Sequence, residues 1–103
     1  MKKNLHTTRI TDSKLQELAE AMKLLGDLNR LKIAVVCLES PVCVGDIAKQ
    51  TGLSQSLASH HLRLMRTARL LKSERNGKQI YYIVNDEHIH CVLVDMIDHV
   101  LET

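Results

Sequence analysis

Four side chains that commonly bind metal ions recur along the last eighteen residues of this chain, 86–103. Asp86, His88, His99 and Glu102 offer two imidazoles and two carboxylates, which are donors that Zn²⁺ accepts in proteins. On a helix with about 100° per residue, His88 and His99 share a face but lie roughly 16 Å apart along the axis. One ion, with metal–nitrogen bonds of about 2.0–2.1 Å, therefore cannot contact both from a single helix.

The four side chains form one pair at each end of this segment. His99 and Glu102 are i, i+3 neighbours that can share an ion, and Asp86 can share one with His88 if Asp86 is the non-helical N-cap. The pairings of 88 with 99 and of 86 with 102 are both centred near Val94. An antiparallel copy would therefore complete two sites, each with Asp86 and His88 from one chain and His99 and Glu102 from the other. The alternative is a solvated polar flank on a dimer helix.

The element that must position these residues is an amphipathic helix over residues 86–102. Its apolar side chains recur at helical spacing and favour packing against a second copy; they are Ile89, Val92, Leu93, Met96, Ile97 and Val100. His90 points about 200° away from His88 and is left out of the predicted site. Cys91 and Asp95 lie close enough in phase to be spare ligands or their supporting groups.

Residues 46–68 predict a helix-turn-helix. A short helix over about 44–51 ends at Gly52, and Ser54 caps a longer helix that runs to about Ala68. In such units the second helix enters the DNA major groove by its N-terminal residues, which here are Gln55, Ser56, Ser59 and His60. The side chains expected to turn inward are Leu57, Ala58, His61, Leu62 and Met65, with His61 as a core or boundary histidine.

Residues 71–84 predict a β-hairpin that follows the helix-turn-helix as a wing. Its strands are expected over 71–75 and 79–84. Asn76-Gly77 between them favours a type I′ turn, which needs positive φ at both central positions. Contacts with DNA phosphates position a protein on DNA without reading its sequence. They are expected from Arg75 and Lys78 at the wing tip and from Arg63 and Arg66 on the second helix of the helix-turn-helix.

The rest of the chain predicts a flexible polar arm over residues 1–10 and two further helices. One helix is expected over about 13–25, and a second runs over 28–38, with Asp27 as its cap and Ser40-Pro41 as its end. The fold class is therefore mainly α with a small β-hairpin wing: one dimeric winged helix-turn-helix domain over residues 1–103, with residues 86–102 as its dimer and metal-binding helix.

Charge is segregated along the chain although its net value is only +2. Residues 47–85 hold seven basic side chains and one acid, whereas residues 86–103 hold five acids and no Lys or Arg. This division indicates an anionic polymer on one surface and a cation on another. Three cysteines without framework spacing indicate a reducing compartment. With no apolar run of about 18 residues and no secretory signal, we expect a cytoplasmic protein without a membrane partner.

The order of these elements resembles the ArsR/SmtB family of winged-helix repressors. The similar strings are LLGDLNRLKI (24–33), VCVGDIA (42–48), LSQSLASHHLRLMR (53–66) and NGKQIYYIV (76–84). The last helix resembles the zinc-sensing branch, whose pattern is D-x-H, ten residues, then H-x-x followed by E or H; Asp86, His88, His99 and Glu102 match it. The resemblance implies a homodimeric repressor, not an enzyme, that binds double-stranded operator DNA and is released by metal.

Three alternatives concern the inducing ligand. Zn²⁺ suits a tetrahedral set of nitrogen and oxygen donors, whereas Co²⁺ or Ni²⁺ would suit a larger set to which His90 or His6 adds ligands. A second, thiolate-rich metal site occurs in some members of the family, and here only Cys43 and Asp46 match its helical part. Other relatives sense persulfide or oxidant through a cysteine pair, for which Cys37 and Cys91 are the candidates.

Overall fold

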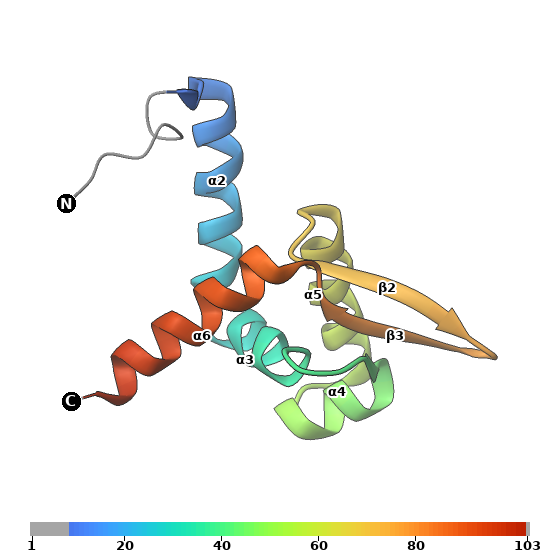
Figure 1. Cartoon of the computed structure of the whole chain (residues 1–103). Coiled ribbons are helices and arrows are strands. Elements are labelled where there is room, and N and C mark those ends of the chain that lie inside the picture. Colours follow the sequence, from blue (N-terminus) through green and yellow to red (C-terminus); the bar gives the residue numbers. More distant parts are fainter. Residues whose placement is uncertain (1–8, 103) are drawn as a thin grey trace.

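The computed structural model describes residues 9–102, so Thr103 and residues 1–8, which include His6 and most of the expected arm, lie outside the described residues. The described chain is mainly helical with a small sheet (Figure 1). Its elements are α2 (Asp12–Leu25), α3 (Leu28–Val36), β1 (Val42–Cys43), α4 (Val44–Thr51), α5 (Gln55–Thr67), β2 (Leu71–Asn76), β3 (Gln79–Val84) and α6 (Glu87–Leu101). The expected winged helix-turn-helix is confirmed.

Side chains cap the starts of the helices where the sequence predicts them. Asp27 and Ser54 accept hydrogen bonds from the backbone N–H groups of Arg30 and Leu57, which satisfies donors that lack an intrahelical partner. Helix α3 ends at Val36, two residues before its expected end. At this end the N–H of Leu38 bonds to the carbonyl of Val35 at 3.2 Å, three residues back instead of four, and the carbonyl of Cys37 accepts from the N–H of Val84 at 3.0 Å.

The sheet is antiparallel with the strand order β1-β3-β2. Strand β1 is not among the predicted elements, because two residues are too few to show an alternating pattern. In the hairpin, Asn76 pairs with Gln79, so the connecting turn is Gly77-Lys78. Only Gly77 has positive φ, at 66°. Glycine at the first central position is the mark of a type II′ turn, and the prediction of a type I′ turn at Asn76-Gly77 is therefore wrong.

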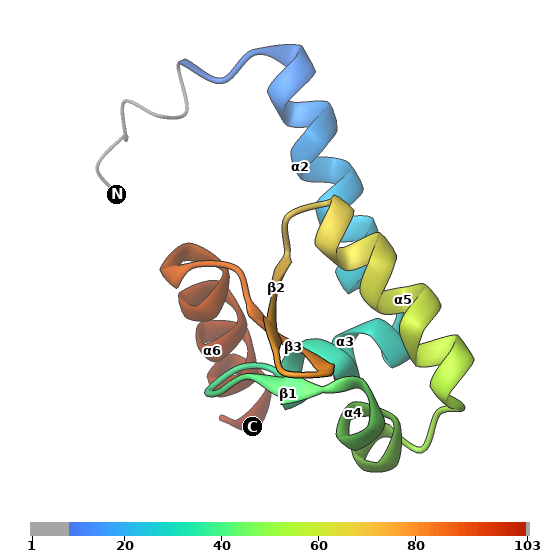
Figure 2. The same ribbon diagram turned by 90° about the vertical axis from the view of Figure 1, so that its right-hand side faces the viewer.

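The core is aliphatic and lies where α3, α4, α5 and the strands meet. Its buried side chains are Ile33, Ala34, Cys37, Ile47, Leu62, Met65, Leu70, Leu71, Val84 and Leu93. Leu93 is the buried residue that α6 contributes. Helices α5 and α6 lie on opposite sides of the domain, with α3 and the strands between them (Figure 2). No helix within residues 9–102 is both long enough and apolar enough to cross a bilayer.

Candidate nucleic-acid interface and metal-binding helix

The N-terminal turn of α5 presents polar side chains outward. Gly52 adopts a left-handed conformation (φ 77°) that ends α4, and Ser54 then begins α5. Gln55, Ser56 and His60 are exposed and Ser59 is half-buried. Hydrogen-bonding groups of this kind, at the start of the second helix of a helix-turn-helix, are suited to contact base edges.

Leu57 departs from the expected inward orientation, since 40% of its surface is exposed. The inward positions of α5 are Ala58, His61, Leu62 and Met65, and a residue immediately before Ala58 points about 100° away from that side. The apolar side chain of Leu57 therefore lies among the candidate base readers, where it can contact a thymine methyl group.

His61 is the buried polar side chain of α5, with 7% of its surface exposed. Its Nδ1 atom accepts a hydrogen bond from Arg30 Nε on α3, at 3.3 Å. Burial, and then the Arg30 guanidinium, lower the pKa of His61. Through this hydrogen bond the neutral imidazole of His61 holds α5 against α3. The expectation that His61 is a core or boundary residue is confirmed.

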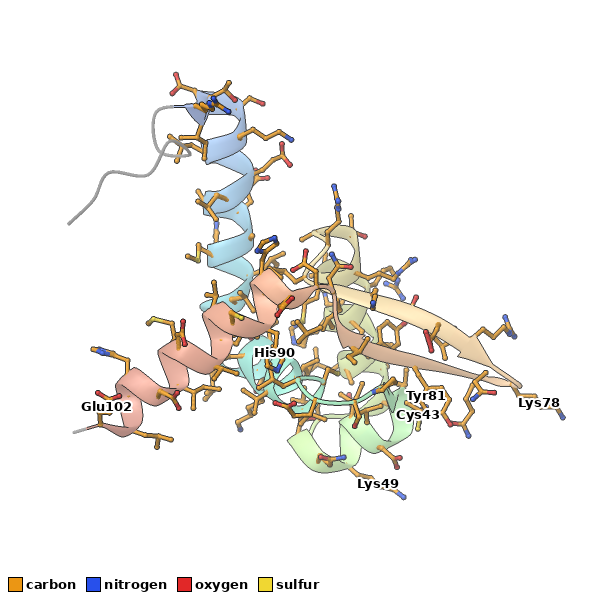
Figure 3. The ribbon with its side chains drawn as sticks, viewed as in Figure 1. Cys43, Lys49, Lys78, Tyr81, His90 and Glu102 are labelled. Carbon is orange, nitrogen blue, oxygen red and sulfur yellow. The ribbon has the colours of Figure 1, made fainter. Side chains whose placement is uncertain are left out.

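The four predicted phosphate contacts are all exposed, and none of them forms an ion pair within residues 9–102. They are Arg63, Arg66, Arg75 and Lys78. Arg75 Nε donates to the carbonyl of Gly77 at 3.4 Å, which braces the turn, and Lys78 stands at the tip of the wing (Figure 3).

Lys49 on α4 is a further cation that the sequence reasoning did not assign to the interface. Together with Lys78, Cys43, Asp46 and Gln55 it lines a hollow between the start of α4 and the wing. The charge excess of the middle segment includes Lys49, but only the fold shows that it shares a surface with Lys78.

Helix α6 separates the predicted metal ligands into two pairs. Asp86 is the N-cap, and its Oδ1 atom accepts from the N–H of Ile89 at 3.0 Å, which leaves Oδ2 available. Exposed His88 lines a hollow with Asp86 and Cys91. At the other end, His99 lies in the last turn and Glu102 is the C-cap. Within residues 9–102 of one chain, no three side chains of these types come together.

The apolar stripe of α6 is divided between two faces. Leu93 is buried and Ile89 packs against the core, whereas the side chains that point away from the domain are exposed by 47%, 57% and 65%: Val92, Met96 and Val100. Helix α2 likewise exposes Leu15, Leu18 and Met22 by 46%, 47% and 55%. A single chain therefore leaves substantial apolar surface in contact with water.

The three cysteines occupy different environments. Cys37 is fully buried in the core, and burial raises its pKa to about 12. Almost no Cys37 thiolate exists near neutral pH, so this residue is poorly suited to the oxidant-sensing pair with exposed Cys91. Cys43 is half-buried and lies with Asp46 beside the wing.

Three known proteins or families resemble this chain. Residues 27–73 match the family described as bacterial regulatory protein, arsR family. The SmtB homolog of Synechocystis sp., a transcriptional repressor, is 34% identical over 85% of this chain and 67% of its own length. The CadC homolog of Staphylococcus aureus, a cadmium resistance transcriptional regulatory protein, is 42% identical over 71% of this chain and 61% of its own length.

The fold is also found among solved structures. A homodimeric winged helix-turn-helix DNA-binding domain from Mycobacterium bovis superimposes with a TM-score of 0.79 at 24% identity, covering 90% of this chain and 88% of that one. At this identity the likeness concerns the fold alone.

Proposed function

We propose a function for this chain on the basis of its family: it belongs to the bacterial arsR family of regulatory proteins. It is accordingly a transcriptional regulator and not an enzyme. Its proposed role is that of a homodimeric repressor that leaves its operator when Zn²⁺, or alternatively Co²⁺ or Ni²⁺, binds between the two α6 helices. The names of the two relatives, a repressor and a cadmium resistance regulator, support a gene for metal resistance as the target.

The observation that carries the metal proposal is the division of ligand-type side chains on α6. Asp86 and His88 are exposed at its start, His99 and Glu102 at its end, and no third ligand-type side chain joins either pair within the described part of one chain. An antiparallel α6 from a second copy would bring the start of one helix to the end of the other. Each resulting site has two imidazoles and two carboxylates, a donor set that fits Zn²⁺.

The exposed apolar side chains support the dimer that this site requires. Val92, Met96 and Val100 lie on the outward side of α6, and α2 exposes a second apolar series. Burial of such surface against a second copy is favourable by about 25 cal/mol per Å². The same contact would therefore cover the apolar side chains and assemble the ligands.

Release from DNA follows as a linkage between two binding events. The bound ion would supply a fixed bridge between the two α6 helices and so set the spacing of the two α5 helices. DNA requires one spacing, because half-sites lie about one helical turn of DNA apart. If the bridged spacing differs from it, metal weakens DNA binding, and DNA weakens metal binding by the same factor.

The test is fluorescence anisotropy of labelled operator DNA, with Zn²⁺ added and then removed by a chelator under reducing conditions. We expect loss of affinity that the chelator reverses. His99→Ala should lower the metal affinity by more than about tenfold, since even loss of a group that only supports a ligand costs 10–100-fold.

Asp98→Asn is the matched control, because Asp98 is an exposed acid at the same end of α6 that lies outside the ligand set. It should respond to Zn²⁺ as the unchanged protein does. A His99→Ala protein that releases DNA at the same Zn²⁺ concentration would refute the site. DNA binding that is indifferent to Zn²⁺, Co²⁺ and Ni²⁺ would refute metal regulation altogether.

A further inference from the structure

One polar contact joins α6 to the segment between α3 and β1. His90 Nε2 lies 3.2 Å from Oε1 of Glu39. A carboxylate can only accept hydrogen bonds, so the imidazole donates through Nε2. Within residues 9–102 this is the only side-chain hydrogen bond between α6 and the rest of the domain. His90 faces the body of the domain, whereas Glu102 lies at the free end of the helix (Figure 3).

The positions of Glu39 and His90 in the chain show which segments their hydrogen bond connects. Glu39 lies in the short segment between α3 and β1, and β1 continues without a break into α4, the first helix of the helix-turn-helix. His90 lies in the first turn of α6, where its N–H donates to the carbonyl of Asp86 at 3.1 Å. The turn that carries the proposed ligands Asp86 and His88 therefore also carries the contact to Glu39.

The remaining attachment of α6 to its own domain is mainly apolar. Leu93 is 5% exposed and Ile89 packs beside it against the core. Apolar packing has no directional requirement, so it tolerates a small shift of one helix over another. A hydrogen bond instead weakens steeply with distance and angle. A shift of α6 would therefore affect the contact between His90 and Glu39 before it disrupts the packing of Leu93.

We propose that His90 and Glu39 act as positioning residues that transmit the metal-bound state of α6 to β1 and α4. This inference rests on the proposed function, since it concerns how metal at Asp86 and His88 alters DNA binding. Neither residue needs to touch the metal or the DNA. Through their hydrogen bond, a shift of the first turn of α6 would move the segment that leads into the helix-turn-helix.

A double-mutant cycle tests the proposal with four full-length proteins: unchanged, His90→Ala, Glu39→Ala and the double variant. For each, DNA affinity is measured by anisotropy without metal and with saturating Zn²⁺. The ratio of the two affinities is the coupling factor. Zn²⁺ affinity is measured separately by competition with a chelating dye. The cycle isolates the pairwise contribution because contacting residues do not behave additively.

We expect each single variant to reduce the coupling factor by about 1.4- to 5-fold, the range for an exposed pair of this kind. The exposures of 36% for His90 and 77% for Glu39 place the contact in that class. The double variant should show no larger loss than either single variant. DNA affinity without metal and Zn²⁺ affinity without DNA should stay within about twofold of the unchanged protein. Glu39→Gln keeps an oxygen acceptor and should retain most of the coupling.

Glu17→Ala is the matched control. Glu17 forms an exposed ion pair with Lys14 at 3.1 Å, but both residues lie on α2. Its removal should leave the coupling factor unchanged. If the unchanged protein responds to Zn²⁺ and both His90→Ala and Glu39→Ala have the same coupling factor as it has, this inference is overturned and the proposed function stands. Losses that add in the double variant, or a lowered Zn²⁺ affinity in the absence of DNA, would also overturn it. Failure of the unchanged protein to respond to Zn²⁺ would instead refute the proposed function.

Discussion

Replacement of Lys78 by Gln should change the salt dependence of DNA binding by a predictable amount. Lys78 is exposed at the tip of the wing, and within residues 9–102 it forms no ion pair that would have to be broken first. Arg63 and Arg66 on α5 and Arg75 on β2 are likewise exposed and form no ion pair within the described residues. Four such contacts per chain make eight per dimer, and each contributes about −0.9 to the slope of log affinity against log salt concentration.

The expected slope is therefore about −7.2 for the unchanged dimer and about −5.4 for the Lys78→Gln dimer, which has two fewer contacts. Between 50 and 200 mM salt, the unchanged protein should lose about 2 × 10⁴ in affinity and the variant about 2 × 10³. Anisotropy measured with the same operator at five or six salt concentrations gives both slopes.

Lys14→Gln provides the control, because it removes the same charge from α2, which projects away from the wing (Figure 1). Its slope should equal that of the unchanged protein. An equal change of slope in both variants would show that net charge, and not contact at the wing tip, sets the salt dependence. An unchanged slope in Lys78→Gln would remove Lys78 from the interface.

Three further outcomes follow from the environments of single residues. Because the folded-state pKa of His61 is lowered, its contribution to stability should be complete above its ordinary pKa of about 6.5. It should be lost as the pH falls through the folded-state pKa, and urea unfolding of His61→Gln should lack this component. Arg69 has φ 63°, so Arg69→Gly should raise the free energy of unfolding by about 1 kcal/mol; an unchanged urea midpoint would contradict this. Iodoacetamide should modify exposed Cys91 in the native protein but not buried Cys37 until urea is added, as mass spectrometry of the labelled peptides can show.

The helix-turn-helix could be predicted from sequence because its signals are local. Ser54 accepts from the N–H of Leu57 at the start of α5, and Gly52 supplies the left-handed residue that ends α4. Both roles depend on the chemistry of one residue and its nearest neighbours. The expected bounds of α4 agree with those of the structure for this reason.

Strand β1 and the turn of the wing depended on partners that the local sequence does not reveal. Val42 and Cys43 form a strand only because Tyr82 and Tyr81 lie opposite them. The Asn76-Gly77 dipeptide permits more than one register, and pairing of Asn76 with Gln79 moved the turn forward by one residue. In both cases the strand opposite decided the outcome.

The candidate metal helix was predictable in its residues but not in its orientation. Periodicity placed Leu93 and Met96 on one broad apolar stripe, whereas the structure buries Leu93 and exposes 57% of Met96. Sequence spacing cannot tell which part of a wide stripe meets its own domain and which part faces outward. The contact of His90 with Glu39 was unpredictable for the same reason, since the partners are 51 residues apart.

The position of β1 also determines which parts of the molecule should open together. Its pairing with β3 ties the wing to the segment that begins α4, and the bond from the N–H of Val84 to the carbonyl of Cys37 ties the base of the wing to the end of α3. Amide hydrogen exchange should therefore report one cooperative opening unit that contains the wing base and the helix-turn-helix. The tip around Gly77 lies beyond β1 and should exchange quickly. The wing can then adjust its tip to the path of a DNA backbone while its base holds the reading helix in place.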